Sequence, residues 1–148
     1  MLDLPSVEMR RDALQARRLR LSKSLSEGDL AAAILIVPAG TPIPIEGTDQ
    51  YHSFHAHNDH AWLSGSRRAG SVLVFDAQDT DSWALFVPEA TREDRVWHGG
   101  GDDLERIAEL TGIDTVLPVA GLEAYLVARR DRPVALIGHR EFLERPGA

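Results

Sequence analysis

The sequence predicts an α/β fold in which helices cover a mixed β-sheet. Residues 31–37 form a continuous apolar run, which is typical of a strand buried on both faces. Two further apolar runs, 71–75 and 82–87, flank a short polar stretch and indicate a β-hairpin. Helical and strand patterns then alternate from residue 102 onward. A chain of 148 residues is long enough for one full hydrophobic core, so we expect a single domain over residues 1–148.

The first expected element is a long amphipathic helix. Pro5 and Ser6 suit its start, and Gly28 suits its end. A set of positions recurs near a helical period: Met9, Leu14, Arg17-Arg18, Leu21 and Leu25. Its basic side chains could bind a polyanion or a partner, but we expect them to form a solvated outer face: Arg10, Arg11, Arg17, Arg18 and Arg20.

The remaining elements follow from apolar runs and their boundaries. The strand at 31–37 lies between Asp29 and Pro38, and we expect it at the centre of the sheet. The hairpin strands 71–75 and 82–87 follow. Downstream we expect a helix at 102–110 ended by Gly112, a strand at 115–117, a helix at 119–130 and a buried strand at 134–137.

Composition excludes several functional classes. The chain has no cysteine, which excludes disulfides, thiolate zinc sites and thiol nucleophiles. Its longest apolar run, 30–39, is far below the ~20 residues that a membrane-spanning helix needs. The first eleven residues carry Asp3, Glu8, Arg10 and Arg11 where a signal peptide would be apolar. We therefore expect a cytoplasmic protein without a membrane partner.

The charge distribution argues against nucleic-acid binding. The formal net charge is −7, and the charge is unevenly spread. Residues 1–25 hold six basic and three acidic side chains, whereas residues 26–148 hold ten basic and twenty acidic ones. An acidic body of this kind repels phosphate backbones.

A histidine-rich stretch lies within a long connector, 38–65, in which we expect no regular structure. Four of the six histidines fall within nine positions: His52, His55, His57 and His60. Imidazole is a common ligand of Zn, Ni, Cu and Fe, so a divalent-metal site is one hypothesis. In an extended chain His55 and His57 would share one face while His52 and His60 point to the other, and the pair His55 and His57 needs further ligands from elsewhere. The alternative, which we favour, is a polar loop whose histidines form hydrogen bonds.

Other catalytic motifs are absent from the sequence. Gly99, Gly100 and Gly101 precede Asp102 and Asp103, whose charges would repel a phosphate at that helix start and instead suit the helix itself. No GxSxG or HExxH motif occurs, and Ser64-Gly65-Ser66 is typical of a turn.

Several short motifs occur in an order that resembles a known family. The first helix bears the pair Arg10-Arg11, and the first strand leads into Val37-Pro38-Ala39-Gly40. The stretch 51–65, YHSFHAHNDHAWLSG, is similar to an aromatic-rich family motif of the form Tyr-x-Phe-Arg-x-x-Ser-Asp-Phe-x-Tyr-Leu-Thr-Gly. The stretches 85–88, LFVP, and 94–99, DRVWHG, match the family's Leu-Phe-Val-Pro and Glu-x-x-Trp-x-Gly. Together these motifs resemble the N-terminal, non-catalytic domain of the Xaa-Pro aminopeptidase, prolidase and creatinase family.

The resemblance implies a function that this chain does not perform alone. Such enzymes cleave the bond between an N-terminal residue and a following proline, or hydrolyse Xaa-Pro dipeptides. The family's catalytic C-terminal pita-bread domain holds two divalent metals, usually manganese, which activate a water. The 148 residues contain none of that domain, so we expect no catalytic residue and no bound cofactor in this chain. The N-terminal domain is similar to an RNase H-like sandwich, which implies topology and no nuclease chemistry.

The resemblance also implies which residues face the substrate or a neighbouring subunit. Asp49 precedes the aromatic motif, and Trp97 resembles a residue that reaches into a neighbouring subunit's site in tetrameric relatives. Asp49 could equally be a turn residue and Trp97 a buried anchor. The other candidates for substrate access or subunit contact lie in the motif itself: His52, His55 and Asp59. His55 replaces an arginine and His60 an aromatic residue of many members, which explains the histidine density as substitution within a known loop.

The implied partners are the protein's own catalytic domain, further copies of the chain in a dimer or tetramer, and proline-containing peptides. In this interpretation the domain narrows access to the catalytic site. Two alternatives stay open: a free-standing binding or assembly module, and a histidine-loop protein that binds divalent metal.

Overall fold

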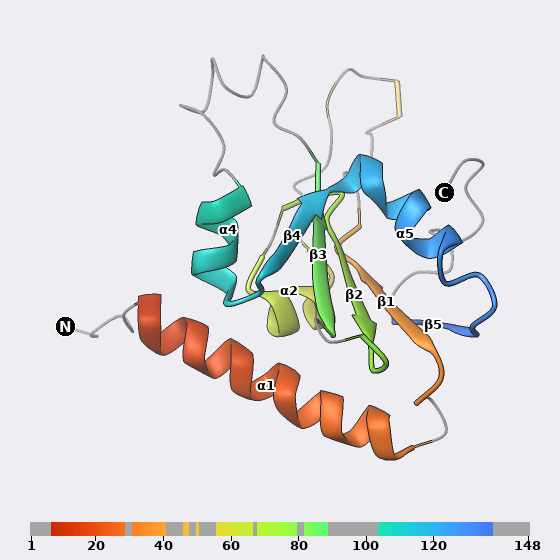
Figure 1. The fold of residues 1–148 in the computed structure, drawn as a ribbon. Helices are drawn as coiled ribbons and strands as arrows, with labels where there is room; N and C mark the ends of the chain where they lie inside the picture. Colours follow the sequence, from red (N-terminus) through yellow and green to blue (C-terminus); the bar gives the residue numbers. More distant parts are fainter. Residues whose placement is uncertain are drawn as a thin grey trace.

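The computed structural model describes residues 7–28, 31–40, 46–47, 50, 56–66, 68–79, 82–88 and 104–137. Five strands form one sheet: β1 (Ile34–Pro38), β2 (Val72–Asp76), β3 (Trp83–Val87), β4 (Thr115–Pro118) and β5 (Val134–Leu136). The helices are α1 (Val7–Glu27), α2 (Asn58–Ser64), α4 (Leu104–Thr111) and α5 (Leu122–Val127), with a 3₁₀ turn at Val119–Gly121. Figure 1 shows α1 crossing one side of the sheet.

The strand order is β4-β3-β2-β1-β5, and the sheet is mixed. β2 is antiparallel to β1 and to β3, while β5 is parallel to β1 and β4 is parallel to β3. The β2–β3 pair is the predicted hairpin, with Leu73 opposite Leu85. The predicted α/β class and the hairpin are therefore confirmed.

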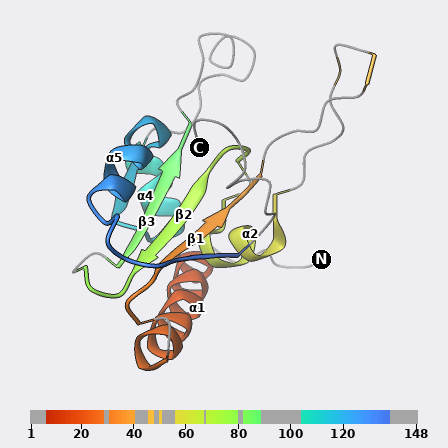
Figure 2. The same cartoon turned by 90° about the vertical axis from the view of Figure 1, so that its right-hand side faces the viewer.

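Helices cover both faces of the sheet, as Figure 2 shows for α5 on one side and α2 on the other. Alternate residues of the strands point to opposite faces. Leu35, Val37 and Leu73 belong to the core beneath α2 and α4, which also contains Leu63 and Ile107. The other face, represented by Ile36, Val74 and Phe86, packs against α5. Double coverage explains why β1 and β2 are apolar at nearly every position rather than alternating.

Two predictions about α1 are wrong. Met9 is 63% exposed because it lies five positions before the buried Leu14, which places it on another side of the helix. Arg18 is 4% exposed and does not belong to a solvated face. It lies four positions after Leu14, on the side where α2 and α4 end against α1.

The prediction of a connector without regular structure is also wrong, because it contains α2. His57 is the N-cap of this helix, and its side chain accepts a hydrogen bond from the Asp59 backbone N–H at 3.4 Å. Gly65 ends the helix in the left-handed conformation, with φ of 76°, and donates its N–H to the Ala61 carbonyl. The polar residues that suggested a loop thus include His57, the N-cap of a seven-residue helix.

The prediction of a buried strand at 134–137 is wrong, because β5 is an edge strand of the described sheet and Val134 is exposed. The other elements shift by a few residues from their expected bounds. β1 begins at Ile34 because a turn occupies the residues before it. The predicted helix at 119–130 is a 3₁₀ turn followed by the shorter α5. Within the described part of the chain, no helix is long and apolar enough to cross a membrane.

Candidate functional site

The predicted site residues lie mainly on two segments, 41–55 and 89–103. Asp49, His52, His55 and Trp97 are outside the described residues. Described residues next to both segments lie close together at one end of the sheet. There His57 N–H donates to the Ala39 carbonyl at 3.0 Å, and Gly70 N–H donates to the Gly40 carbonyl at 2.8 Å. Added at Gly70, a Cβ would lie 3.0 Å from Cγ of Pro88, the last described residue before the second segment.

The sheet topology explains why the two segments start together. β1 and β3 are both antiparallel to β2, so they run in the same direction and end at the same edge of the sheet (Figure 1). One strand separates them, which corresponds to about 10 Å at the usual strand spacing. The described ends of β1 and β3, after which the chain enters the two segments, therefore lie about 10 Å apart at this edge.

Asp59 is the one predicted access residue that the structure describes. It is exposed in the first turn of α2, where a carboxylate favours the partial positive charge of the helix N-terminus. His57 Nδ1 lies 3.8 Å from Asp59 Oδ2, and the His57 side chain is 26% exposed. Asp59 thus has a structural role in α2, and its contact with substrate or subunit stays a prediction.

His60 is buried against β1 and contacts no solvent. Its Nδ1 lies 2.7 Å from the Val37 carbonyl, which can only accept, so Nδ1 carries the hydrogen and Nε2 is the bare acceptor. Nε2 has no hydrogen-bond partner among the described residues. Burial lowers the pKa of His60; the hydrogen bond to Val37 opposes this shift, and the charge of His57 adds to it. His60 is therefore a neutral packing residue of α2.

Metal binding finds little support in the described residues. Within them, no group of three or more His, Asp or Glu side chains gathers to hold an ion. Of the predicted pair His55 and His57, only His57 is described, and its near neighbour is Asp59. The histidine metal site therefore stays a prediction, because His52 and His55 lie outside the described residues. The two metals that the resemblance implies were expected in another domain.

Arg18 is the feature of this site that sequence reasoning missed. Its Nη1 donates to the Leu63 carbonyl at 2.8 Å and its Nη2 to the Thr111 carbonyl at 2.7 Å. Leu63 lies in the last turn of α2 and Thr111 is the last residue of α4. The one available signal was its spacing, because Arg18 lies in register with Leu14, Leu21 and Leu25 on the inward stripe of α1.

Arg17 makes a parallel contact at the surface. Its Nη1 donates to the Trp62 carbonyl at 3.1 Å, and its guanidinium lies 5.0 Å from the Trp62 ring centroid. The Trp62 side chain is half-exposed beside it. Consecutive arginines of α1 thus hold consecutive carbonyls of α2.

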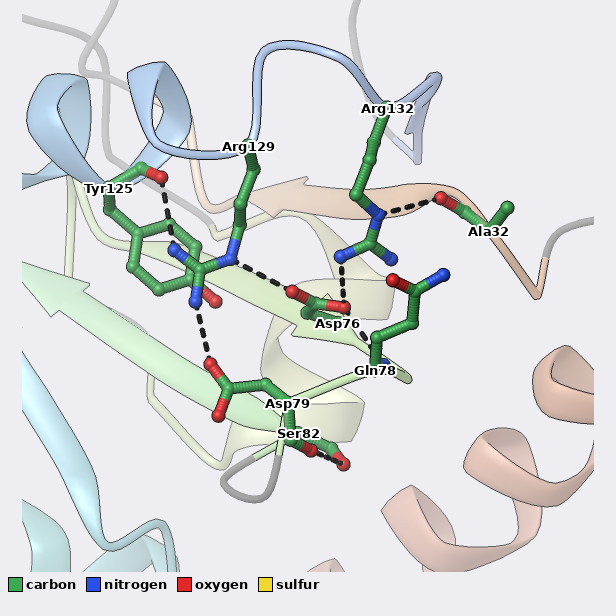
Figure 3. Close-up of polar contacts among 8 residues, drawn as sticks. All are labelled: Ala32, Asp76, Gln78, Asp79, Ser82, Tyr125, Arg129 and Arg132. Atoms are coloured by element: carbon green, nitrogen blue, oxygen red, sulfur yellow. Dashed lines mark hydrogen bonds and ion pairs between the residues drawn. The ribbon is translucent and has the colours of Figure 1, made fainter.

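A second polar cluster lies on the opposite face of the sheet (Figure 3). Asp76 ends β2 and accepts hydrogen bonds from Arg129 Nε at 2.8 Å and from Arg132 Nη1. Arg129 also donates to Asp79 at 2.6 Å and lies 3.6 Å from the Tyr125 ring centroid. Burial opposes ionisation of Asp76, but the two arginines outweigh it and lower the pKa of this carboxyl. This cluster fastens the turn after α5 to the hairpin and is separate from the segment-bearing end.

Comparisons with known proteins agree with this architecture. A family model described as the aminopeptidase P N-terminal domain matches residues 14–134. The structure of Pseudomonas aeruginosa aminopeptidase PepP is similar, with a TM-score of 0.75 and 21% identity over 98% of this chain. Aminopeptidase P from E. coli, in its low-pH form, gives a TM-score of 0.67 with 19% identity over 85% of this chain. Both likenesses concern the fold.

A curated relative adds a match in sequence. The mitochondrial intermediate cleaving peptidase 55 of Arabidopsis thaliana is 26% identical over 110 residues, which is 74% of this chain. The chain spans only 21% of that relative, 31% of the Pseudomonas chain and 27% of the E. coli chain. The matched residues, 14–134, extend from the first buried residue of α1 to β5. The chain therefore belongs to the aminopeptidase P family, as its N-terminal domain.

Proposed function

We propose that this chain is the non-catalytic N-terminal part of an Xaa-Pro aminopeptidase or Xaa-Pro dipeptidase, in which it restricts substrate access. The family match supports this proposal, together with the small share of each relative that the chain spans. Catalysis then belongs to a domain outside these 148 residues. That domain would hold two divalent metals, which we propose are manganese and which supply an activated water.

One observation carries the access role: both segments with predicted site residues leave the sheet at the same end. The flanking hydrogen bonds of Ala39 and Gly40 and the ends of β1 and β3 establish that end. We propose that side chains of the two segments form a rim that admits a peptide by length. We propose that Asp49, His52, His55, Asp59 and Trp97 line this rim or contact a neighbouring subunit.

The partners follow from the same proposal. The domain would pack against its own catalytic domain, and the enzyme would form a dimer or tetramer that acts on proline-containing peptides. We propose a cytoplasmic location and neither nucleic-acid nor membrane partners. The acidic body of the chain supports the exclusion of nucleic acid.

Peptidase assays on the full-length protein and on residues 1–148 test whether catalysis belongs to another domain. The full-length protein and a chain of residues 1–148 are each loaded with Mn²⁺ and assayed on an Xaa-Pro dipeptide and on a longer Xaa-Pro peptide. We expect cleavage by the full-length protein and none by residues 1–148. Metal-dependent cleavage by residues 1–148 would refute the non-catalytic role, and an inactive full-length protein would refute the peptidase assignment.

A further inference from the structure

We propose that a groove between α1 and the first residues of β3 and β4 binds a free amino acid with an apolar side chain, through both of its charged ends. The groove has a volume of about 360 Å³, and all residues that line it belong to the described part of the chain. Figure 1 shows α1 passing this side of the sheet. The segments 41–55 and 89–103 follow the last residues of β1 and β3, whereas the groove lies where β3 begins. The groove is therefore separate from the access role proposed above and does not rest on it.

The first observation is an apolar wall. Trp83, Ile113 and the α1 residue Leu19 line the groove. The Trp83 indole is fixed by a hydrogen bond from its Nε1 to Ser22 Oγ at 2.9 Å and by the Phe75 ring, whose centroid lies 4.7 Å away. Leu19 is 58% exposed beside it. A fixed indole next to an exposed leucine offers apolar surface that the side chain of a ligand would cover.

The second observation is a carboxylate without a partner. Asp114 lies in the short connection from α4 to β4, is exposed and lines the groove. It forms no hydrogen bond or ion pair among the described residues. Gln15 also lines the groove, and its Nε2 donates to the Gly112 carbonyl at 3.2 Å, which leaves its Oε1 as a second acceptor. A carboxylate and an amide oxygen suit the N–H donors of an ammonium group.

The third observation is a buried cation without a counter-ion. Arg18 lines the same groove and is 4% exposed. Burial lowers the pKa of Arg18 only to about 10, so the side chain is charged at neutral pH. Its two hydrogen bonds go to the neutral carbonyls of Leu63 and Thr111, and no carboxylate among the described residues forms an ion pair with it. A guanidinium has five N–H donors, so further donors remain for a carboxylate that enters the groove.

The three features together match the parts of one small molecule. Arg18 and Asp114 line one groove but form no ion pair with each other. The carboxylate of a free amino acid would bind Arg18, its ammonium would bind Asp114, and its side chain would cover Trp83 and Leu19. A simple cation would leave Arg18 without a counter-ion, and a polyanion would be repelled by Asp114. The volume lies at the lower end of the range for small-molecule sites, roughly 300–1,000 Å³, which suits a ligand of this size.

Amide hydrogen exchange in the full-length protein tests the ligand. L-leucine is compared with L-leucinamide, which lacks the carboxylate, and with N-acetyl-L-leucine, which lacks the ammonium. We expect L-leucine to protect α1 and residues 112–115 with a Kd of about 1 mM or below, and each analogue to bind at least about tenfold more weakly. No protection by L-leucine, or equal protection by either analogue, would overturn the proposal.

The two analogues test the charges of the groove without a substitution at Arg18, which also binds the two helix carbonyls. The protection is read at the groove itself, so L-leucine bound in another domain does not imitate it. Peptidase activity is not measured in this experiment. Failure of the groove proposal therefore leaves the proposed peptidase function standing, and the reverse also holds.

Two substitutions at exposed positions test the residues that line the groove. Asp114→Asn removes a charge at constant size, and Leu19→Ala removes part of the apolar wall. The control is Asp131→Asn, because Asp131 is an exposed aspartate in the turn after α5 that forms no ion pair among the described residues and does not line the groove. We expect the Kd of L-leucine to rise at least about tenfold in Asp114→Asn and about fivefold in Leu19→Ala, and to stay unchanged in Asp131→Asn. An unchanged Kd in either groove variant, or an equal rise in the control, would overturn the proposal.

Discussion

His60 illustrates at the scale of one residue how burial decides what a histidine does. It belongs to the histidine-rich stretch that suggested a metal, yet it is fully buried and bonded to the Val37 carbonyl. Its protonated form would place a second N–H at a buried Nε2 that has no partner among the described residues. His60 therefore makes the free energy of unfolding depend on pH.

The His60 pKa predicts a loss of stability in mild acid. The unfolded chain binds a proton near pH 6.5 and the folded chain only at lower pH, so the stability is complete above 6.5 and falls as the pH drops below it. Between pH 7 and 5.5 we therefore expect this residue to lower the free energy of unfolding. Urea unfolding at both pH values should show a smaller loss for His60→Phe than for the wild type. Equal losses in the two proteins would contradict the assignment.

The burial of Asp76 predicts a large loss of stability for the substitution Asp76→Asn. This residue is 3% exposed and binds two arginines, so Asp76→Asn leaves both cations without their buried counter-charge. We expect a destabilisation of about 3 kcal/mol at pH 7, measured by urea unfolding. Because the folded pKa of Asp76 is lowered, this stabilisation is complete above the ordinary value of 3.8 and shrinks as the pH falls below it.

Asp79→Asn is the matched control for Asp76. The Asp79 side chain is 32% exposed and shares Arg129, so water compensates part of its loss and we expect a cost below 1 kcal/mol. Equal losses of stability for Asp76→Asn and Asp79→Asn would show that burial does not determine how much each carboxylate stabilises the fold.

At the scale of the elements, close contact between α1 and α2 depends on Gly65. Its φ of 76° disfavours any side chain, and the site of a Cβ is already occupied by Leu14. This contact places α2 within reach of Arg18 and Arg17.

Gly65→Ala tests this contact against Gly47→Ala. Gly47 has a similar φ of 78° but nothing within 4 Å of a Cβ, so both variants bear the left-handed strain of about 1–2 kcal/mol and only Gly65→Ala adds the clash. We expect Gly65→Ala to lower the free energy of unfolding by at least 1 kcal/mol more than Gly47→Ala. Equal losses in the free energy of unfolding for the two variants would contradict the claim that close contact between α1 and α2 at Gly65 stabilises the fold.

The sequence predicted the strands better than the helices, for physical reasons. β1, β2 and β3 are buried on both faces, so their continuous apolar runs carry a direct signal. α2 was missed because its start is a histidine cap and its buried residues include His60 and Ser64, which have no apolar period. Arg18 was wrongly predicted to face solvent. The sequence alone does not distinguish an arginine that donates to helix carbonyls from an arginine that is solvated.

At the scale of the whole molecule, the sheet topology determines where the candidate site lies. The mixed strand order brings the ends of β1 and β3 to one edge, and α1 fixes the helices that follow both segments. The motifs around Asp49 and Trp97 were read from the resemblance alone, and these two residues lie outside the described ranges. Their proposed roles involve a catalytic domain that we propose lies outside these residues.

The ratio of kcat/KM for a long Xaa-Pro peptide to that for an Xaa-Pro dipeptide, measured in the full-length enzyme with and without Trp97→Ala, tests the central claim most directly. An access domain predicts that the substitution shifts this ratio toward longer peptides or raises KM while cleavage continues, because in the proposed function the metals are held by another domain. Unchanged values of both the ratio and KM would contradict the claim that this chain controls access to the catalytic site.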